Sequence, residues 1–174
     1  MPSFSVKSAA RGFVFAAGVA AMSAASAVPI TYEGSLTPGV TVSGFISNPE
    51  LTGSPNDDFW RFDGIQGQVI TLVGNRLDRG LDLAFYLYQG SGTDTDDLGG
   101  WIEFADDDIP TLPGLEGPFS DPRLLNFSLP ATAVYTVQVW DYASSALPDG
   151  TDRPYQLTLS GATVPEPSSL PLLG

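Results

Sequence analysis

The chain has 174 residues, a length that favours a single domain. It contains 20 acidic and 7 basic residues, and neither cysteine nor histidine. This composition excludes disulfide bonds, nucleophiles of the serine–histidine or cysteine–histidine type, and zinc held by imidazole or thiolate.

Residues 1–27 have the features of a secretory signal peptide. Lys7 and Arg11 supply a positive start, residues 12–22 are apolar, and Ala25–Ala27 forms a small-x-small cleavage site. The alternative is a short membrane anchor, but the apolar run is shorter than the ~20 residues of a spanning helix. We therefore expect export through the Sec translocon and cleavage by signal peptidase at the end of this segment.

The mature chain that we expect after cleavage is strongly acidic. It keeps five arginines, no lysine and all 20 acids, so its net charge is −15. Such a surface repels nucleic acid and anionic lipid, and it suits cations. Solubility of an exported protein is an equally good explanation of the acidity. The absence of lysine also excludes Schiff-base chemistry.

Short apolar segments separated by Gly, Pro and Asp turns fill residues 28–161, and their apolar residues alternate with period two. No segment in this range shows a helical stripe. Seven to nine such strands predict an all-β fold, an antiparallel and jelly-roll-like β-sandwich. The residues expected to face inward are Val42, Gly44, Ile46, Trp60, Phe62, Leu81, Leu83, Phe85, Leu87, Leu125, Phe127, Leu129, Tyr135, Val137, Val139, Tyr155, Leu157 and Leu159.

Two tryptophans are candidates for an exposed platform on which a ligand stacks. Trp140 falls on the strand face opposite to Val137 and Val139, and Trp101 is the second candidate. A plain role in the core or at a sheet edge is the alternative for both.

The order of these segments resembles the bacterial pre-peptidase C-terminal domain, a β-sandwich often appended to secreted peptidases. The resemblance covers about residues 40–161 and departs from the family at Val134 and in the long insertion 109–123. It is carried by NDDFWRF (56–62), GQVITLVG (67–74), LDLAFYLYQG (81–90), FADDD (104–108), LNFSLPATAVYTVQVWDY (125–142) and YQLTLSG (155–161).

A second resemblance concerns the C-terminal residues, where Val164, Pro165, Glu166 and Pro167 are followed by two serines. This pattern resembles the PEP-CTERM sorting signal of biofilm-forming Gram-negative bacteria, which a membrane exosortase processes. The resemblance implies a protein that is secreted or held at the cell surface. Only seven residues follow the motif, too few to span a bilayer, so we expect residues 162–174 to form a flexible tail with a shortened signal.

Acidic residues gather in turns, and Ca²⁺ prefers six to eight oxygen ligands of this kind. In calcium-binding relatives of the family that the chain resembles, acids in comparable turns contribute ligands. The candidate calcium ligands are Asp57, Asp58, Asp78, Asp82, Asp106, Asp107 and Asp108. Asp is also an ordinary turn residue, and charges on edge strands discourage aggregation, so solvated turns are the alternative.

These observations favour a non-catalytic secreted or cell-surface protein associated with the extracellular matrix or exopolysaccharide. A calcium-dependent module that binds carbohydrate or protein is the alternative. A glycan hydrolase is a third hypothesis, and it requires two carboxylates that face each other across a cleft at ~5–10 Å.

Overall fold

The structure is a computed structural model that describes residues 29–47, 57–143 and 152–162. The predicted signal peptide (1–27) and residues 163–174, which include the sorting motif (164–167), lie outside these residues, whereas Ala162, predicted as the first residue of the tail, is the last residue of a strand. Within the three described ranges, no helix is long and apolar enough to cross a membrane.

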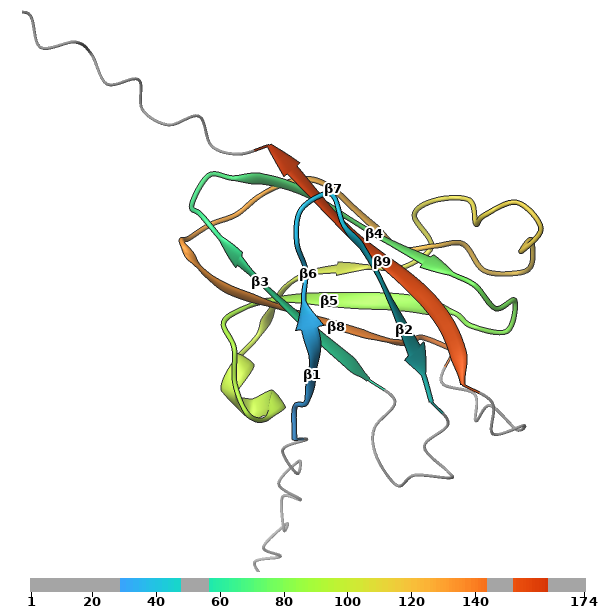
Figure 1. Cartoon of the computed structure of the whole chain (residues 1–174), viewed down its shortest axis with the longest axis horizontal. Coiled ribbons are helices and arrows are strands. Elements are labelled where there is room, and N and C mark those ends of the chain that lie inside the picture. Colours follow the sequence, from blue (N-terminus) through green and yellow to red (C-terminus); the bar gives the residue numbers. More distant parts are fainter. Residues whose placement is uncertain (1–28, 48–56, 144–151, 163–174) are drawn as a thin grey trace, which may run out of the picture.

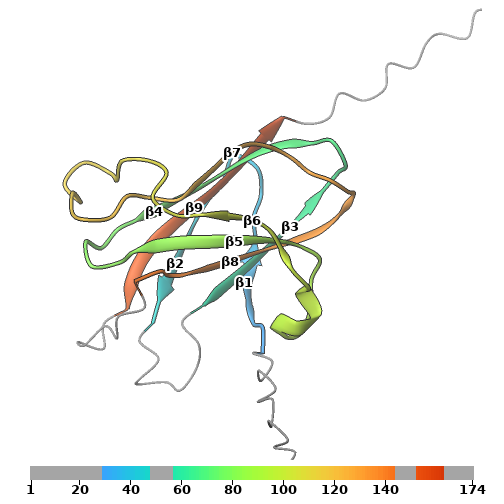
Figure 2. The same ribbon diagram turned by 180° about the vertical axis from the view of Figure 1, so that it is seen from behind.

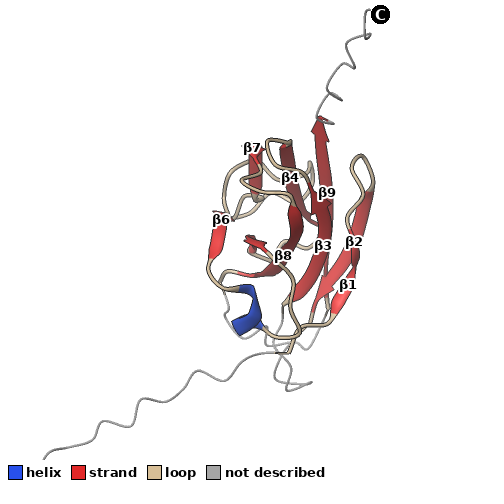
Figure 3. Cartoon of the chain, turned by 90° about the vertical axis from the view of Figure 1, so that its left-hand side faces the viewer, coloured by secondary structure: helices blue, strands red, loops and turns tan. Residues whose placement is uncertain are grey.

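Two β-sheets pack face to face (Figures 1 and 3). One sheet has the strand order β1-β3-β8-β5-β6 and the other the order β2-β9-β4-β7. Among the described strands only β1 and β3 pair in parallel, and the other paired strands run antiparallel. The predicted all-β, antiparallel sandwich is therefore confirmed. The strands are β1 (Tyr32–Ser35), β2 (Thr41–Ile46), β3 (Asp58–Gly64), β4 (Val69–Arg76), β5 (Leu83–Gln89), β6 (Trp101–Ala105), β7 (Arg123–Ser128), β8 (Ala133–Asp141) and β9 (Arg153–Ala162).

The core lies between the sheets and contains most of the residues that period-two alternation predicts. In β5 and β8 the inward residues Phe85, Tyr135 and Val139 are fully buried, and the ring of Phe62 stacks on that of Tyr135 at 5.3 Å. Because strand residues two apart share a face, one inward set per strand is enough to fill the layer between the sheets.

The alternation predicted for β7 is wrong at Leu125, which is 55% exposed, while Leu124 and Phe127 pack against the core. Asn126 has a positive φ of 53°, and the pairing of β4 with β7 shifts register at this point. A bulge adds one residue to a strand and reverses the faces on either side of it. Asn is one of the few residues that adopt positive φ readily, so it permits this bulge.

A hydrogen-bonded chain connects the two sheets through the core. Trp60 in β3 donates from Nε1 to the hydroxyl oxygen of Tyr155 in β9 at 2.7 Å, and that hydroxyl donates to Asp58 Oδ2 at 2.7 Å. Gly44 lies against this chain, and a Cβ at that position would overlap both Tyr155 and Asp58. The glycine therefore allows strand β2 to cover the polar connection closely.

The long segment between β6 and β7 folds back on the sandwich beside the turn between β4 and β5 (Figure 2). Its two arms are joined by an antiparallel bridge between Ile109 and Asp121. Arg76, at the end of β4, is fully buried beneath it and donates from Nη2 to the carbonyl oxygens of Leu115 and Phe119 at 3.0 and 2.8 Å. The insertion thus builds one end of the sandwich, where acidic residues also gather.

Candidate metal centre

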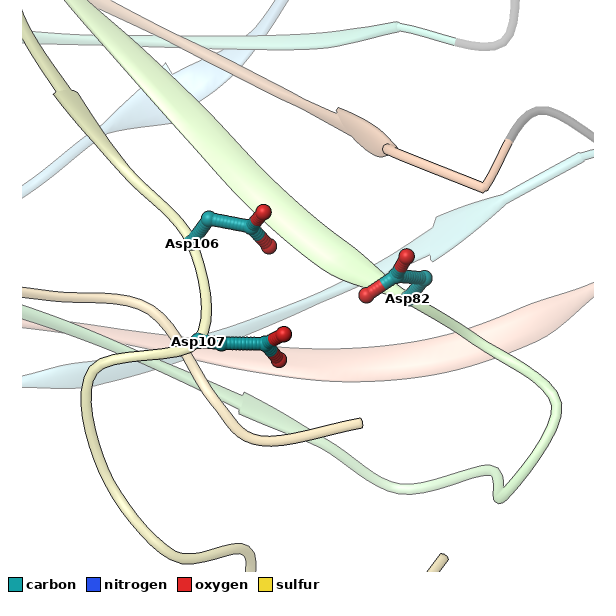
Figure 4. A group of neighbouring side chains, drawn as sticks. All are labelled: Asp82, Asp106 and Asp107. Carbon is teal, nitrogen blue, oxygen red and sulfur yellow. The ribbon is translucent and has the colours of Figure 1, made fainter. Parts of the chain in front are cut away.

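Three aspartates from two places in the chain converge at this end of the sandwich. Asp82 immediately precedes β5, and Asp106 and Asp107 immediately follow β6. Each offers a carboxylate oxygen such that the three atoms lie within 4.8 Å of one another. Figure 4 shows Asp106 and Asp107 pointing across the gap toward the carboxylate of Asp82.

Backbone hydrogen bonds fix the positions of these aspartates. The backbone amide of Asp82 donates to Asp141 Oδ1 at 3.1 Å, and its carbonyl oxygen accepts from the amide of Tyr142 at 2.7 Å. Asp107 Oδ1 accepts a hydrogen bond from the amide of Ser120 at 2.6 Å, which ties it to the insertion. The site is therefore built by β5, β8 and the folded-back segment together.

Two oxygens of these carboxyl groups are buried and lack a hydrogen-bond partner among the described residues. They are Oδ1 of Asp82, a residue that is only 5% exposed, and Oδ1 of Asp106. Buried polar atoms in proteins are almost always paired, because a carboxylate without water or a donor pays its full desolvation free energy. These two oxygens are therefore candidates to bind a cation.

Electrostatics at the site disfavour the ionised carboxylates. Burial, followed by the charges of Asp82, Asp107 and Asp108, raises the pKa of Asp106 to about 6. Burial and the charges of Asp107 and Asp141 raise the pKa of Asp82, against the opposing effect of Arg76. Without a cation these carboxyl groups repel one another.

Arg76 offsets only part of this charge. Its Nε lies 3.7 Å from Asp121 Oδ1, and both side chains are fully buried. Asp121 Oδ2 is a further buried oxygen without a partner in the described part of the chain, and burial raises the pKa of this carboxyl group. When Asp82, Asp106, Asp107 and Asp121 are all ionised, four negative charges face one positive charge, which leaves −3.

The donor set suits a hard divalent cation. Calcium binds carboxylate oxygens at 2.3–2.6 Å, so two oxygens on one ion lie up to about 5 Å apart, in keeping with the 4.8 Å spread observed. Magnesium requires shorter bonds in near-ideal octahedral geometry, which a spread of this size satisfies less well. The remaining calcium ligands would come from backbone carbonyl groups, water or the second oxygen of a carboxylate.

The structure brings together three of the seven predicted ligands. The other four have different partners: Asp57 accepts from Gln138, Asp58 accepts from Tyr155, Asp78 pairs with Arg153, and Asp108 accepts from the amides of Asp106 and Arg123. Asp121 was missed, because sequence alone did not show that the insertion turns back to place it beside Arg76.

Trp101 and Trp140, the candidate stacking residues, lie on the same face of the five-stranded sheet. Each contacts the ring of Tyr86, with centroid distances of 5.7 and 5.6 Å. Tyr86, Phe104 and Tyr142 were not singled out in the sequence, although the alternation within β5 already placed Tyr86 on the outer face.

No protein-family model and no curated protein sequence matches the chain. Among solved structures it is similar to the pre-peptidase C-terminal domain of a collagenase from Bacillus anthracis, with 14% identity, 75% of this chain and 97% of that chain covered, and a TM-score of 0.47. It is also similar to CorA, a surface-associated copper-binding protein of Methylomicrobium album BG8 (12% identity, 78% and 100% covered, TM-score 0.47). A third similar structure is PliG of Aeromonas hydrophila, a periplasmic inhibitor of g-type lysozyme (16% identity, 76% and 100% covered, TM-score 0.45).

Proposed function

We propose that the chain is a non-catalytic, calcium-stabilised β-sandwich that acts at the cell surface or in the extracellular matrix of a Gram-negative bacterium. The observation that carries this proposal is the convergence of Asp82, Asp106 and Asp107, with two buried oxygens that lack partners in the described residues. A calcium ion supplies the positive charge that the site lacks.

The cation would act as a clamp between separate parts of the fold. Asp82 belongs to the start of β5, Asp107 follows β6, and the contact of Asp107 with Ser120 extends the clamp to the segment that leads into β7. Because β5 and β7 belong to different sheets, the ion would join the sheets at one end of the sandwich. A chain without cysteine gains from metal the kind of cross-link that disulfides give other exported proteins.

The destination of the protein is inferred from segments outside the described residues. The signal at residues 1–27 supports export by the Sec translocon and signal peptidase, and the motif at residues 164–167 supports handling by an exosortase. Extracellular calcium modules bind with dissociation constants of roughly 10⁻⁴–10⁻³ M, so the clamp would close when the chain reaches calcium-rich surroundings outside the cell. Matrix components, including exopolysaccharide, are the proposed partners.

A glycan hydrolase with paired carboxylates is less well supported. Its acid pair would need to face a sugar across an open cleft. Asp82 is buried, and the raised pKa of Asp106 is explained by burial and three neighbouring carboxylates without a catalytic role.

The test is thermal unfolding of the mature protein in millimolar calcium and in chelator at matched ionic strength. We expect a higher Tm in calcium, because a ligand that binds only the native state adds about 2.7 kcal/mol at a hundredfold excess over Kd. Asp107→Asn should shrink the calcium effect, and in chelator it should raise Tm by relieving repulsion. Asp63→Asn removes the same charge from an exposed position on β3 and serves as the control. Equal Tm values in calcium and chelator would refute the clamp.

A further inference from the structure

Six aromatic side chains form a continuous group on the outer face of β5, β6 and β8, the side of the sandwich seen in Figure 2. We call this group the ring cluster; its members are Tyr86, Tyr88, Trp101, Phe104, Trp140 and Tyr142. It is separate from the core, which lies on the other face of the same strands.

The rings follow one another across the strands. Centroid distances are 5.7 Å from Trp101 to Tyr86, 5.6 Å from Tyr86 to Trp140 and 5.5 Å from Trp140 to Tyr142. Phe104 lies beside this row, 5.0 Å from Tyr86 and 5.9 Å from Tyr142. Four rings in succession offer contacts to more than one unit of a polymeric ligand.

The two ends of the row are open to solvent. Trp101 is 57% exposed and Tyr142 is 49% exposed, whereas Tyr86 and Trp140 between them are half-buried. The inward faces of these strands already fill the core, so exposed rings at both ends are not needed for packing. Exposed aromatic groups that gather on one face mark interaction sites.

A polar chain borders the row. The hydroxyl of Tyr88 donates to Gln138 Oε1 at 2.6 Å, and Gln138 Nε2 donates to Asp57 Oδ2 at 2.6 Å. Asp57 is close enough for its charge to raise the pKa of Tyr88, which burial and Tyr86 bring to about 12. A carboxylate therefore stands at one border of the aromatic face.

The charge around the ring cluster is complementary to a cation. The cation–π contacts of the described residues join Arg61 to Tyr32 and Arg76 to Phe119, and both lie outside the cluster. Aromatic faces attract ammonium groups, most strongly the faces of tryptophan. With Asp57 at the border and −15 on the expected mature chain, an anionic polymer would be repelled and a basic one attracted.

We propose that the ring cluster binds a basic glycan, a polysaccharide chain with free amino sugars. Sugar rings would pack on the aromatic faces of Trp101 and Tyr142, and ammonium groups would lie over the π-systems and near Asp57. The row crosses the strands, so the ligand would lie across the sheet, unlike a peptide that adds as a strand to an edge. This inference rests on the extracellular role proposed above but does not require calcium at the aspartate site.

The experiment measures binding of a glucosamine hexamer to the mature protein by calorimetry, in calcium and at a pH where the amines are protonated. We expect saturable binding that weakens roughly tenfold with Trp101→Ala or Tyr142→Ala, in line with the strength of a cation–π contact. Asp57→Asn should weaken binding as well. Phe45→Ala is the matched control, because Phe45 is an equally exposed aromatic residue on the other sheet, and it should leave binding unchanged.

Two further probes decide whether the ligand is a basic glycan. The N-acetylated hexamer has the same backbone without charge, and a lysine hexamer has the charge without sugar rings. The proposal is supported if both probes bind more weakly than the glucosamine hexamer. Equal binding of either one, no binding of the glucosamine hexamer, or equal effects of Trp101→Ala and Phe45→Ala would overturn it. Failure of the calcium clamp would appear instead as an absent calcium effect on Tm.

Discussion

Asp58 and Asp106 are two partly buried carboxyl groups whose pKa values are both raised to about 6, but their surroundings differ. At Asp58 burial and the charges of Glu33 and Asp57 raise the pKa, against hydrogen bonds from the Tyr155 hydroxyl, which also accepts from Trp60, and from the backbone of Phe45. At Asp106 burial is reinforced by three neighbouring carboxylates, and Oδ1 has no partner in the described part of the chain.

The comparison separates a structural acid from a candidate ligand. A raised pKa alone does not distinguish the two, because desolvation produces it in both places. The hydrogen bonds do distinguish them: Asp58 Oδ2 is bonded to Tyr155 in the connection between the sheets, whereas Asp106 Oδ1 has no partner among the described residues, which fits the proposed role of Asp106 as a ligand.

The largest effect is expected from Tyr155→Phe, which keeps the buried ring and removes its hydroxyl. The substitution leaves Trp60 Nε1 without its acceptor and removes the Tyr155 hydrogen bond to Asp58, which keeps only the one from the backbone of Phe45. A buried group left unsatisfied costs about 1–3 kcal/mol, so the loss of two partners should lower the free energy of unfolding by roughly 2–5 kcal/mol. Urea unfolding of the two proteins measures this decrease in the free energy of unfolding.

Tyr142→Phe is the control for that experiment, since its ring is half exposed and its loss of a hydroxyl should change stability by less than about 0.5 kcal/mol. The Tyr155→Phe loss should be the same in calcium and in chelator. A loss that depends on calcium would mean that Asp58 belongs to the metal site after all.

A smaller effect is expected from pH, because Asp58 and Asp106 keep part of their surfaces in water. Their folded pKa values near 6 exceed the usual value of about 3.8, so the native state holds these protons more tightly than the unfolded state. Their contribution to stability is therefore lost as pH rises through about 6. In chelator, Tm should rise when pH is lowered from about 7 to about 5.

Calcium should flatten this pH dependence, because a bound cation favours the ionised form of Asp106 and leaves Asp58 to titrate alone. Asp106→Asn should give the same flattening in chelator, whereas Asp63→Asn should not. Identical pH profiles in calcium and chelator would contradict the proposed difference between the two acids.

The sandwich could be predicted from sequence because alternation within single strands decides which residues are buried. Leu125 shows where this fails: the register shift at Asn126 depends on pairing with β4, which the local pattern does not contain. The candidate metal centre was predictable only in part. Asp82, Asp106 and Asp107 stand out as acids in turns, but Arg76 and Asp121 join them through a bridge formed by the folded-back insertion.

The ring cluster, too, could be predicted only in part from the sequence. Trp101 and Trp140 lie far apart in the sequence, and their connection requires the order β6-β5-β8, which places Tyr86 between them. Contacts across neighbouring strands depend on sheet order and register, and neither is contained in the periodicity of one strand.

The smallest effect is expected at Asp78, a predicted calcium ligand that the structure pairs with Arg153 instead. The Asp78 side chain is 40% exposed, and ion pairs at such positions contribute about 0–1 kcal/mol. Asp78→Asn should therefore lower the free energy of unfolding by less than about 1 kcal/mol, and high salt should shrink the loss, because exposed charges are screened. The rise in Tm on adding calcium should be the same as for the unmodified chain, in contrast to Asp107→Asn. If Asp78→Asn abolished the calcium effect, the acids near the start of β5 would form one site with Asp78 in it, and the pairing with Arg153 would have to give way when calcium binds.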